Sequence, residues 1–131
     1  MQLHAQIIDA CFAASPNVRY VAAYLDGKVG LRSRADIQLL GSNESDQYEE
    51  IIVNPTLLKL VTQRGNIDCG GLQHVVVRYG MFVAFILPVD GGHVTVSFEL
   101  DSNLDEEIPG ITAVIHGLVP VSRTGGPQSD A

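Results

Sequence analysis

Apolar residues between Leu72 and Leu100 follow the spacing of β-strands, and this stretch predicts the centre of the fold. Val75 to Val77 is a run of β-branched residues, which suit the pleated surface of a sheet. Residues 82–87 are apolar without interruption. From Val94 to Leu100 apolar and polar residues alternate, as in a strand with one apolar face. The stretch therefore predicts three consecutive strands.

Turn-forming residues separate these three strands. Gly80 interrupts the first two and predicts a tight hairpin over residues 79–82. Pro88 cannot donate to a strand ladder and is predicted to end the second strand. Residues 90–92, Asp-Gly-Gly, supply the backbone freedom of a short loop. Because the second strand is apolar at every position, we expect it to be covered on both faces.

The strand from His74 to Arg78 leaves one edge without an assigned neighbour. Its apolar residues fall on both faces, yet it is the first strand of its group. An exposed apolar edge promotes aggregation. We therefore expect another strand of this chain, or a strand of a second chain, to pair along it.

The residues before this group predict one helix and one hairpin. Apolar residues recur at spacings of three and four from Leu3 to Ala14, which is typical of an amphipathic helix, and Pro16 follows its end. Val18–Leu25 and Lys28–Arg34 are predicted strands joined by the two-residue turn Asp26-Gly27. The lysine and two arginines of the second strand predict an outer position in the sheet.

A helix is predicted to begin at Ser45 or Asp46, because either side chain can cap its first turn. Glu49 and Glu50 follow where the helix dipole favours carboxylates, and we expect both on a solvated face. The expected apolar side of this helix is Tyr48, Ile51 and Ile52.

Asn54 and Pro55 are predicted to interrupt this helix. Asn54 is a favourable N-cap and Pro55 a favourable first helical residue, so a second segment is predicted from Pro55 to Arg64. Gly65 is expected just after its end. Because proline breaks the helical hydrogen-bond ladder, we expect a kinked helix or two abutting helices.

The C-terminal part predicts one more helix and a tail. Pro109 can open a helix, and Pro120 ends it. Its apolar stripe is Ile111, Val114, Ile115 and Leu118. The composition of residues 120–131 predicts disorder. Strands grouped as hairpins, with helices between the groups, indicate a single α+β domain over residues 1–119 in the order α-β-β-α(kinked)-β-β-β-α, with an antiparallel sheet.

Composition and charge narrow the function. The chain has 131 residues and a formal net charge of -7, which argues against nucleic acid or an anionic membrane as a partner. No apolar run approaches the roughly 20 residues that span a bilayer, and the N-terminus lacks a signal-peptide pattern. Cys11 and Cys69 show no metal-binding spacing, so we expect reduced thiols and a cytoplasmic protein.

No catalytic or cofactor-binding constellation is visible. The four histidines fall in separate elements without the paired spacing of zinc ligands. Asp68 beside Cys69 disfavours the thiolate that a nucleophile needs. The glycines of residues 65–71 follow a helix and precede a strand, the reverse of a phosphate-binding loop. We therefore predict no catalytic residue, no cofactor and no metal site, and a protein that is not an enzyme.

The order of elements resembles the roadblock/LC7 superfamily. The resemblance covers about Leu3 to Leu118. It is carried by the Asp-Gly hairpin after VRYVAAYL, by NPTLLKLVTQRGNIDCGGL leading into VVVRYG, and by VAFILPVDGGHVTVSFE. It implies a small bacterial member with a profilin-like fold, in which a five-stranded antiparallel sheet has helices on both faces.

The resemblance also implies a dimer. In that superfamily the first strand of the last three pairs with its mate across a two-fold axis, and the central helices pack together over it. Here the implied interface comprises Leu57, Leu60, Val61, Arg64, His74, Val75, Val76, Val77 and Arg78. Members of the superfamily hold or regulate small Ras-like GTPases. The implied function is therefore a non-enzymatic dimeric module that docks or regulates such a GTPase or a related signalling partner.

Ligand sensing is the alternative function. Domains of the related PAS and longin-like architectures hold a small apolar molecule between sheet and helices. A pocket in that position would favour this alternative, whereas a filled core would remove it.

Overall fold

The computed structural model describes residues 1–37 and 43–121. The elements in chain order are α1 (Gln2–Ala14), β1 (Val18–Leu25), β2 (Lys28–Ser33), α2 (Asn43–Tyr48), the π-helical turn η1 (Glu49–Val53), α3 (Asn54–Asp68), β3 (Val75–Arg78), β4 (Val83–Val89), β5 (Gly92–Phe98) and α4 (Leu104–His116). The predicted α+β fold is confirmed. Residues 122–131, most of the predicted tail, lie outside the described residues, whereas Val121 forms a bridge to Val89.

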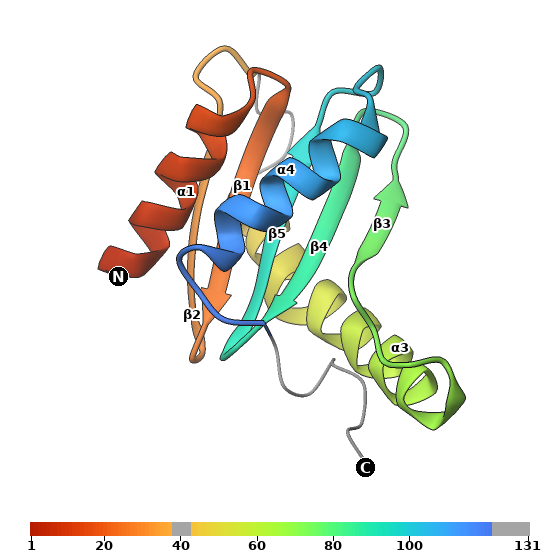
Figure 1. Ribbon diagram of the computed structural model, residues 1–131. Coiled ribbons are helices and arrows are strands. Elements are labelled where there is room, and N and C mark those ends of the chain that lie inside the picture. The colour runs from red at the N-terminus through yellow and green to blue at the C-terminus, as the bar shows by residue number, and fades with distance from the viewer. Residues whose placement is uncertain (38–42, 122–131) are drawn as a thin grey trace.

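The five strands form one antiparallel sheet in the order β2-β1-β5-β4-β3. Helices α1 and α4 cover one face, and the continuous run α2–η1–α3 lies behind the other (Figure 1). Every residue of β4 is buried, as its uninterrupted apolar sequence predicts, but Pro88 lies inside the strand, so its prediction as the end of the strand is wrong. Strand β2 is an outer strand, also as predicted, and β3 forms the opposite edge.

The apolar core lies between the sheet and the pair α1 and α4. Alternate residues of β1, β4 and β5 point into it, and Phe85 and Phe98 are its largest fully buried side chains. Burial of one such side chain contributes about 1.5–3 kcal/mol. The main apolar cluster therefore lies on one face of the sheet, and the other face buries fewer apolar side chains, among them Ile86. On the other face β5 presents His93, Thr95 and Ser97, all buried and all polar.

The central helix consists of abutting segments, as predicted in outline, but it changes type through the π-helical turn η1 and is not capped anew at Asn54. Asn54 has φ -68° and ψ -43°, which is helical, so its prediction as an N-cap is wrong. Its N–H instead donates to the carbonyl oxygen of Glu49, five residues back, in a widened π turn. A proline ring clashes with the carbonyl four residues earlier in an α-helix. The wide turn before Pro55 moves that carbonyl aside, so the helix continues through the proline.

Two other predicted helix ends also differ. Gly65 lies inside α3, which runs on to Asp68. A Cβ at Gly65 would come within 3.2 Å of the backbone of Gly71, so glycine permits this close approach. Helix α4 begins at Leu104, and Pro109 lies inside it.

The β1–β2 turn provides a test of backbone strain. Asp26 and Gly27 have φ of 51° and 81°, the left-handed pattern of a type I′ turn. We expect Gly27→Ala to lower the free energy of unfolding by about 1–2 kcal/mol, measured by urea denaturation. Nothing lies within 4 Å of the added Cβ, so the loss reflects the backbone alone. Gly80→Ala is the control, because Gly80 has equal space and no positive φ. Equal losses in the two variants would contradict this explanation.

Candidate functional site

The helix run α2–η1–α3 has polar side chains against the sheet and apolar side chains toward solvent. Glu50 is 0% exposed and Asn54 1%, whereas Ile52 is 49% and Leu60 62% exposed. The prediction of Glu50 on a solvated face is therefore wrong. The predicted apolar side of the helix does not pack against the sheet. Its residues are all exposed on the outside of the helix: Tyr48, Ile51 and Ile52.

Helix geometry explains this inversion. Asp46, Glu50, Asn54 and Leu58 succeed one another at four-residue intervals. In a regular α-helix a four-residue interval drifts by about 40° at each step. The π turn η1 is wider and takes back part of that drift. Glu50, Asn54 and Leu58 are buried as a result, although no apolar periodicity marks the side that they form.

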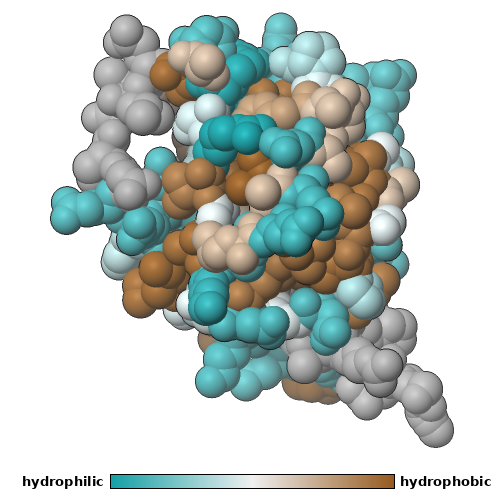
Figure 2. Space-filling view, turned by 90° about the vertical axis from the view of Figure 1, so that its left-hand side faces the viewer, coloured by the Kyte–Doolittle hydropathy of each residue, from teal (hydrophilic) through white to brown (hydrophobic). Residues whose placement is uncertain are grey.

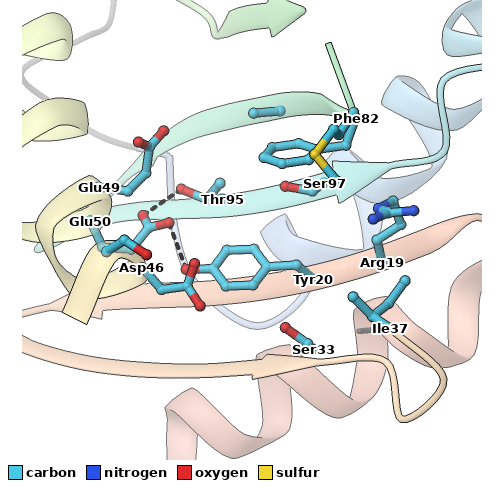
Figure 3. Close-up of a pocket in the computed structure, with 13 residues that line it drawn as sticks. Arg19, Tyr20, Ser33, Ile37, Asp46, Glu49, Glu50, Phe82, Thr95 and Ser97 are labelled. Atoms are coloured by element: carbon cyan, nitrogen blue, oxygen red, sulfur yellow. Dashed lines mark hydrogen bonds between the residues drawn. The ribbon is translucent and has the colours of Figure 1, made fainter. Parts of the chain in front are cut away.

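Glu50 joins the helix to the sheet through a buried polar cluster. Its Oε2 accepts a hydrogen bond from the Tyr20 hydroxyl at 2.9 Å. Its Oε1 accepts from Thr95 Oγ1 at 2.7 Å and from His93 Nε2 at 2.8 Å. Asn54 Nδ2 also donates to Oε1, at 3.1 Å. Figure 3 shows the bonds of Glu50 to Tyr20 and Thr95. We call these five residues the Glu50 cluster.

The Glu50 cluster holds the carboxylate in its ionised form. Burial by itself raises the pKa of Glu50. The hydrogen bonds from His93, Thr95 and Tyr20, together with the charge of His93, act in the opposite direction and prevail, so the pKa lies below its usual value. An ionised carboxylate only accepts hydrogen bonds, so His93 Nε2 is the donor. Burial, then the charge of Glu50, raises the pKa of the Tyr20 hydroxyl, which stays protonated as a donor.

A pocket of about 310 Å³ opens beside the Glu50 cluster, between α2–η1 and the sheet. Figure 3 shows side chains from the helix and from neighbouring strands around it. Its lining is Arg19, Tyr20, Ser33, Ile37, Ser45, Asp46, Glu49, Glu50, Met81, Phe82, Ala84, Thr95 and Ser97. A pocket between sheet and helix is the feature that ligand sensing requires, so that alternative stays open.

The nine predicted interface residues lie on α3, on β3 and just before β3. Half-buried among them are Leu57, Val61, His74, Val75 and Val77. Exposed among them are Leu60, Arg64, Val76 and Arg78. Arg64 Nη1 pairs with Asp68 Oδ1 at 2.6 Å, and Arg78 Nη2 donates to the carbonyl of Leu100 at 3.1 Å.

The outer edge of β3 has no strand beside it in the described part of the chain. The Tyr79 N–H donates to the Phe82 carbonyl at 2.9 Å, so these two residues form a hydrogen-bonded pair. Bonded and non-bonded pairs alternate along an antiparallel ladder. The N–H and C=O groups of Val76 and Arg78 therefore point away from β4, toward the open edge. Val76 is also 40% exposed.

The two edges of the sheet differ in how they are protected. On β2, Arg32 pairs with Asp9 at 2.9 Å and lies over the Phe12 ring. Figure 2 shows this side of the molecule, where hydrophilic and hydrophobic side chains are interspersed. On β3 and in the turn after it the exposed large apolar residues are Val76, Tyr79 and Met81, and on α3 they include Leu60 and Ile67. Strand β3 is thus the edge that other strands can approach.

Three further features bear on function: possible metal ligands, membrane-spanning helices and the two cysteines. Within residues 1–37 and 43–121, no group of three or more His, Cys, Asp or Glu side chains is arranged to hold a metal ion. No helix in those ranges has the length and apolar character to cross a bilayer. Both cysteines are free, and burial raises the pKa of Cys11 to about 12. Cys69 is exposed, with its Sγ 3.3 Å from Arg64 Nη1.

Comparison with known proteins identifies the fold. No family model and no curated protein matches the chain. Among solved structures, a roadblock/LC7 domain from Streptomyces avermitilis matches with TM-score 0.66 and 14% identity over 85% of this chain and 90% of that one. MglB in a tetrameric arrangement matches with TM-score 0.67 and 9% identity, over 95% and 88%. The gliding protein MglB from Thermus thermophilus matches with TM-score 0.64 and 9% identity, over 95% and 89%. The fold is that of roadblock/LC7 domains, as the sequence resemblance predicted.

Proposed function

We propose that this chain with the roadblock/LC7 fold is a non-enzymatic interaction module that works as a homodimer. The open edge of β3 is the observation that carries the proposal. It presents unpaired backbone groups at Val76 and Arg78, and its side chains are apolar on both faces. Such an edge recruits another strand unless charges or cover block it. A second copy of β3 is a self-complementary partner across a two-fold axis.

The proposed dimer also uses the outer face of the central helix. Val77 lies opposite Ala84 in the ladder, so both side chains point to the face that η1 and α3 cover. Pairing two β3 strands would bring the two α3 helices together on that face. Leu60 and Arg64, both exposed in the single chain, would then become interface residues with Leu57 and Val61. The tetrameric arrangement of MglB, a protein of the same fold, supports self-association here.

The proposed partner of the dimer is a small Ras-like GTPase or a related signalling protein in the cytoplasm. The resemblance of the sequence to the superfamily supports this choice, and the net charge of -7 argues against nucleic acid. The test is capture by the immobilised dimer from a lysate of the source organism, with added GDP or a non-hydrolysable GTP analogue. A GTPase, identified by mass spectrometry and retained with only one of these nucleotides, would support the proposal. Retention of no such protein would count against it.

The proposed homodimer can be tested directly by measuring the mass of the protein in solution. We expect sedimentation equilibrium at low micromolar concentration to give twice the chain mass of 14.1 kDa. The expected reason is that pairing satisfies the outward backbone groups of β3 and covers Val76. A single species of monomer mass at that concentration would reject the dimer.

A further inference from the structure

We infer that the pocket between α2–η1 and the sheet binds a small organic cation, an amine carried on an apolar body. This inference goes beyond the interaction function, because it concerns the inner side of the helix and not the proposed dimer surface. It rests on the size of the pocket, on the apolar part of its wall and on the charges around it.

The pocket has the size and lining of a small-ligand site. Its volume of about 310 Å³ lies at the lower end of the range for such sites. The Tyr20 and Phe82 rings and the side chains of Ile37 and Met81 supply apolar wall. Packed protein interiors leave few voids larger than a water molecule. An open hollow of this size next to fully buried Glu50 has room for a small organic ligand.

Acidic side chains outnumber basic ones in the pocket lining, which favours a cationic ligand. Arg19 is the only basic residue in the lining, and its Nη1 is engaged by Glu99 Oε1 at 3.0 Å. Glu50 is saturated by its own cluster. Asp46 and Glu49 remain on the helix side of the pocket (Figure 3). Glu49 accepts a hydrogen bond from the Tyr79 hydroxyl at 3.0 Å, whereas no hydrogen bond contributes to the pKa shift of Asp46.

The electrostatics of these two carboxylates agree with that geometry. Burial, and then the charge of Glu50, raises the pKa of Asp46. Burial also raises the pKa of Glu49, although the Tyr79 hydrogen bond opposes the shift. Ionisation of either carboxylate therefore has a cost, which a nearby cation would offset.

An ammonium group matches this site better than a metal ion does. It donates three hydrogen bonds, and the pocket lining offers acceptors of the matching kind in the Asp46 and Glu49 carboxylates and in hydroxyls such as Ser33. The apolar walls would contact the organic body and the aromatic rings would favour the positive charge. The described residues offer no metal-binding group of three or more ligands.

The test is calorimetric titration of the protein with phenethylamine at neutral pH. We expect saturable binding of one molecule per chain. The matched probes 2-phenylethanol and 3-phenylpropionate have the same ring and chain but no positive charge, and we expect them to bind at least about tenfold more weakly. Equal affinities for the three probes, or no saturable binding of the amine, would overturn the inference.

Substitutions in the pocket test whether phenethylamine binds there. Asp46→Asn and Glu49→Gln should each weaken phenethylamine binding by about tenfold, the effect of losing one charge-assisted hydrogen bond. Asp105→Asn, an exposed acid on α4 outside the pocket, is the control and should leave the affinity unchanged. Ser33→Phe, at the edge strand β2, should fill the pocket and abolish binding, with circular dichroism to confirm folding. Unchanged affinity in folded Asp46→Asn and Ser33→Phe would contradict this location.

Discussion

Replacing Glu50 by alanine should lower the free energy of unfolding by about 3–5 kcal/mol, the range for removing one partner from a buried, hydrogen-bonded network around a charge. The variant leaves the Tyr20 hydroxyl, the Thr95 hydroxyl and His93 Nε2 without their shared acceptor. All three lie beneath the helix, and His93 and Thr95 are each only 1% exposed. Urea denaturation followed by far-UV circular dichroism measures the loss.

Glu49 is the matched control for Glu50. It is the preceding residue of the same helix, is only half-buried, and accepts one hydrogen bond, from Tyr79. We expect Glu49→Ala to cost about 1 kcal/mol or less. Losses of similar size in Glu49→Ala and Glu50→Ala would mean that the Glu50 cluster does not hold the helix to the sheet.

The Glu50 cluster also makes the stability of the folded chain depend on pH. The folded pKa of Glu50 lies below the ordinary 4.5, so the unfolded chain binds its proton more readily. The stabilisation by Glu50 is therefore complete above about 4.5 and is lost as the pH falls through the lower folded pKa. Raised pKa values at Asp46 and Glu49 act in the opposite sense. Glu50→Gln should remove the acid loss that belongs to Glu50, and an unchanged acid profile would contradict the assignment.

Replacing Val76 by proline should weaken the homodimer by about a hundredfold. Proline removes the outward N–H of β3 without removing a bond to β4, so the single chain should still fold. In a two-fold dimer the change occurs twice. Two lost hydrogen bonds and poorer side-chain contact cost about 3 kcal/mol, which corresponds to that factor. Sedimentation velocity over a concentration series measures the dissociation constant.

Val76→Ala separates backbone pairing from side-chain contact. It keeps the outward N–H and shortens the same side chain, so we expect a loss of only a few-fold in dimer affinity. A dimer that tolerates Val76→Pro as well as Val76→Ala would show that chains associate through another surface. The proposed interface residues of β3 would then be wrong.

The strands could be predicted from the sequence because their signals are local. Uninterrupted apolar residues mark β4, and the Asp26-Gly27 turn marks the β1–β2 hairpin. The valines of β3 and its position as the first of three strands also raised the question of its outer edge, but left open whether a strand of this chain pairs there; the described residues supply none. Each of these features depends on backbone preferences and burial, and both can be judged from residues that are close together in the sequence.

The Glu50 cluster could not be found by the same reasoning, because a search for apolar periodicity assumes that a helix buries its apolar side. A signal was nevertheless present in β5. Thr95 and Ser97 alternate with valines in a strand that has neighbours on both sides. Buried polar groups need hydrogen-bond partners, so the element covering this face had to supply polar side chains. In the central helix, Glu50 and Asn54, four residues apart, supply these polar side chains.

The π turn has a consequence for how this fold diverges. A helix with one five-residue turn contains one residue more than regular pitch requires over the same length. Loss of a single codon within residues 49–53 would restore regular pitch and rotate all of α3 by about 100° relative to α2. Leu60 and its neighbours would then face a new direction with no change in their identity. Insertion and deletion at this turn, more than substitution, would therefore redirect which surface the domain offers to other proteins.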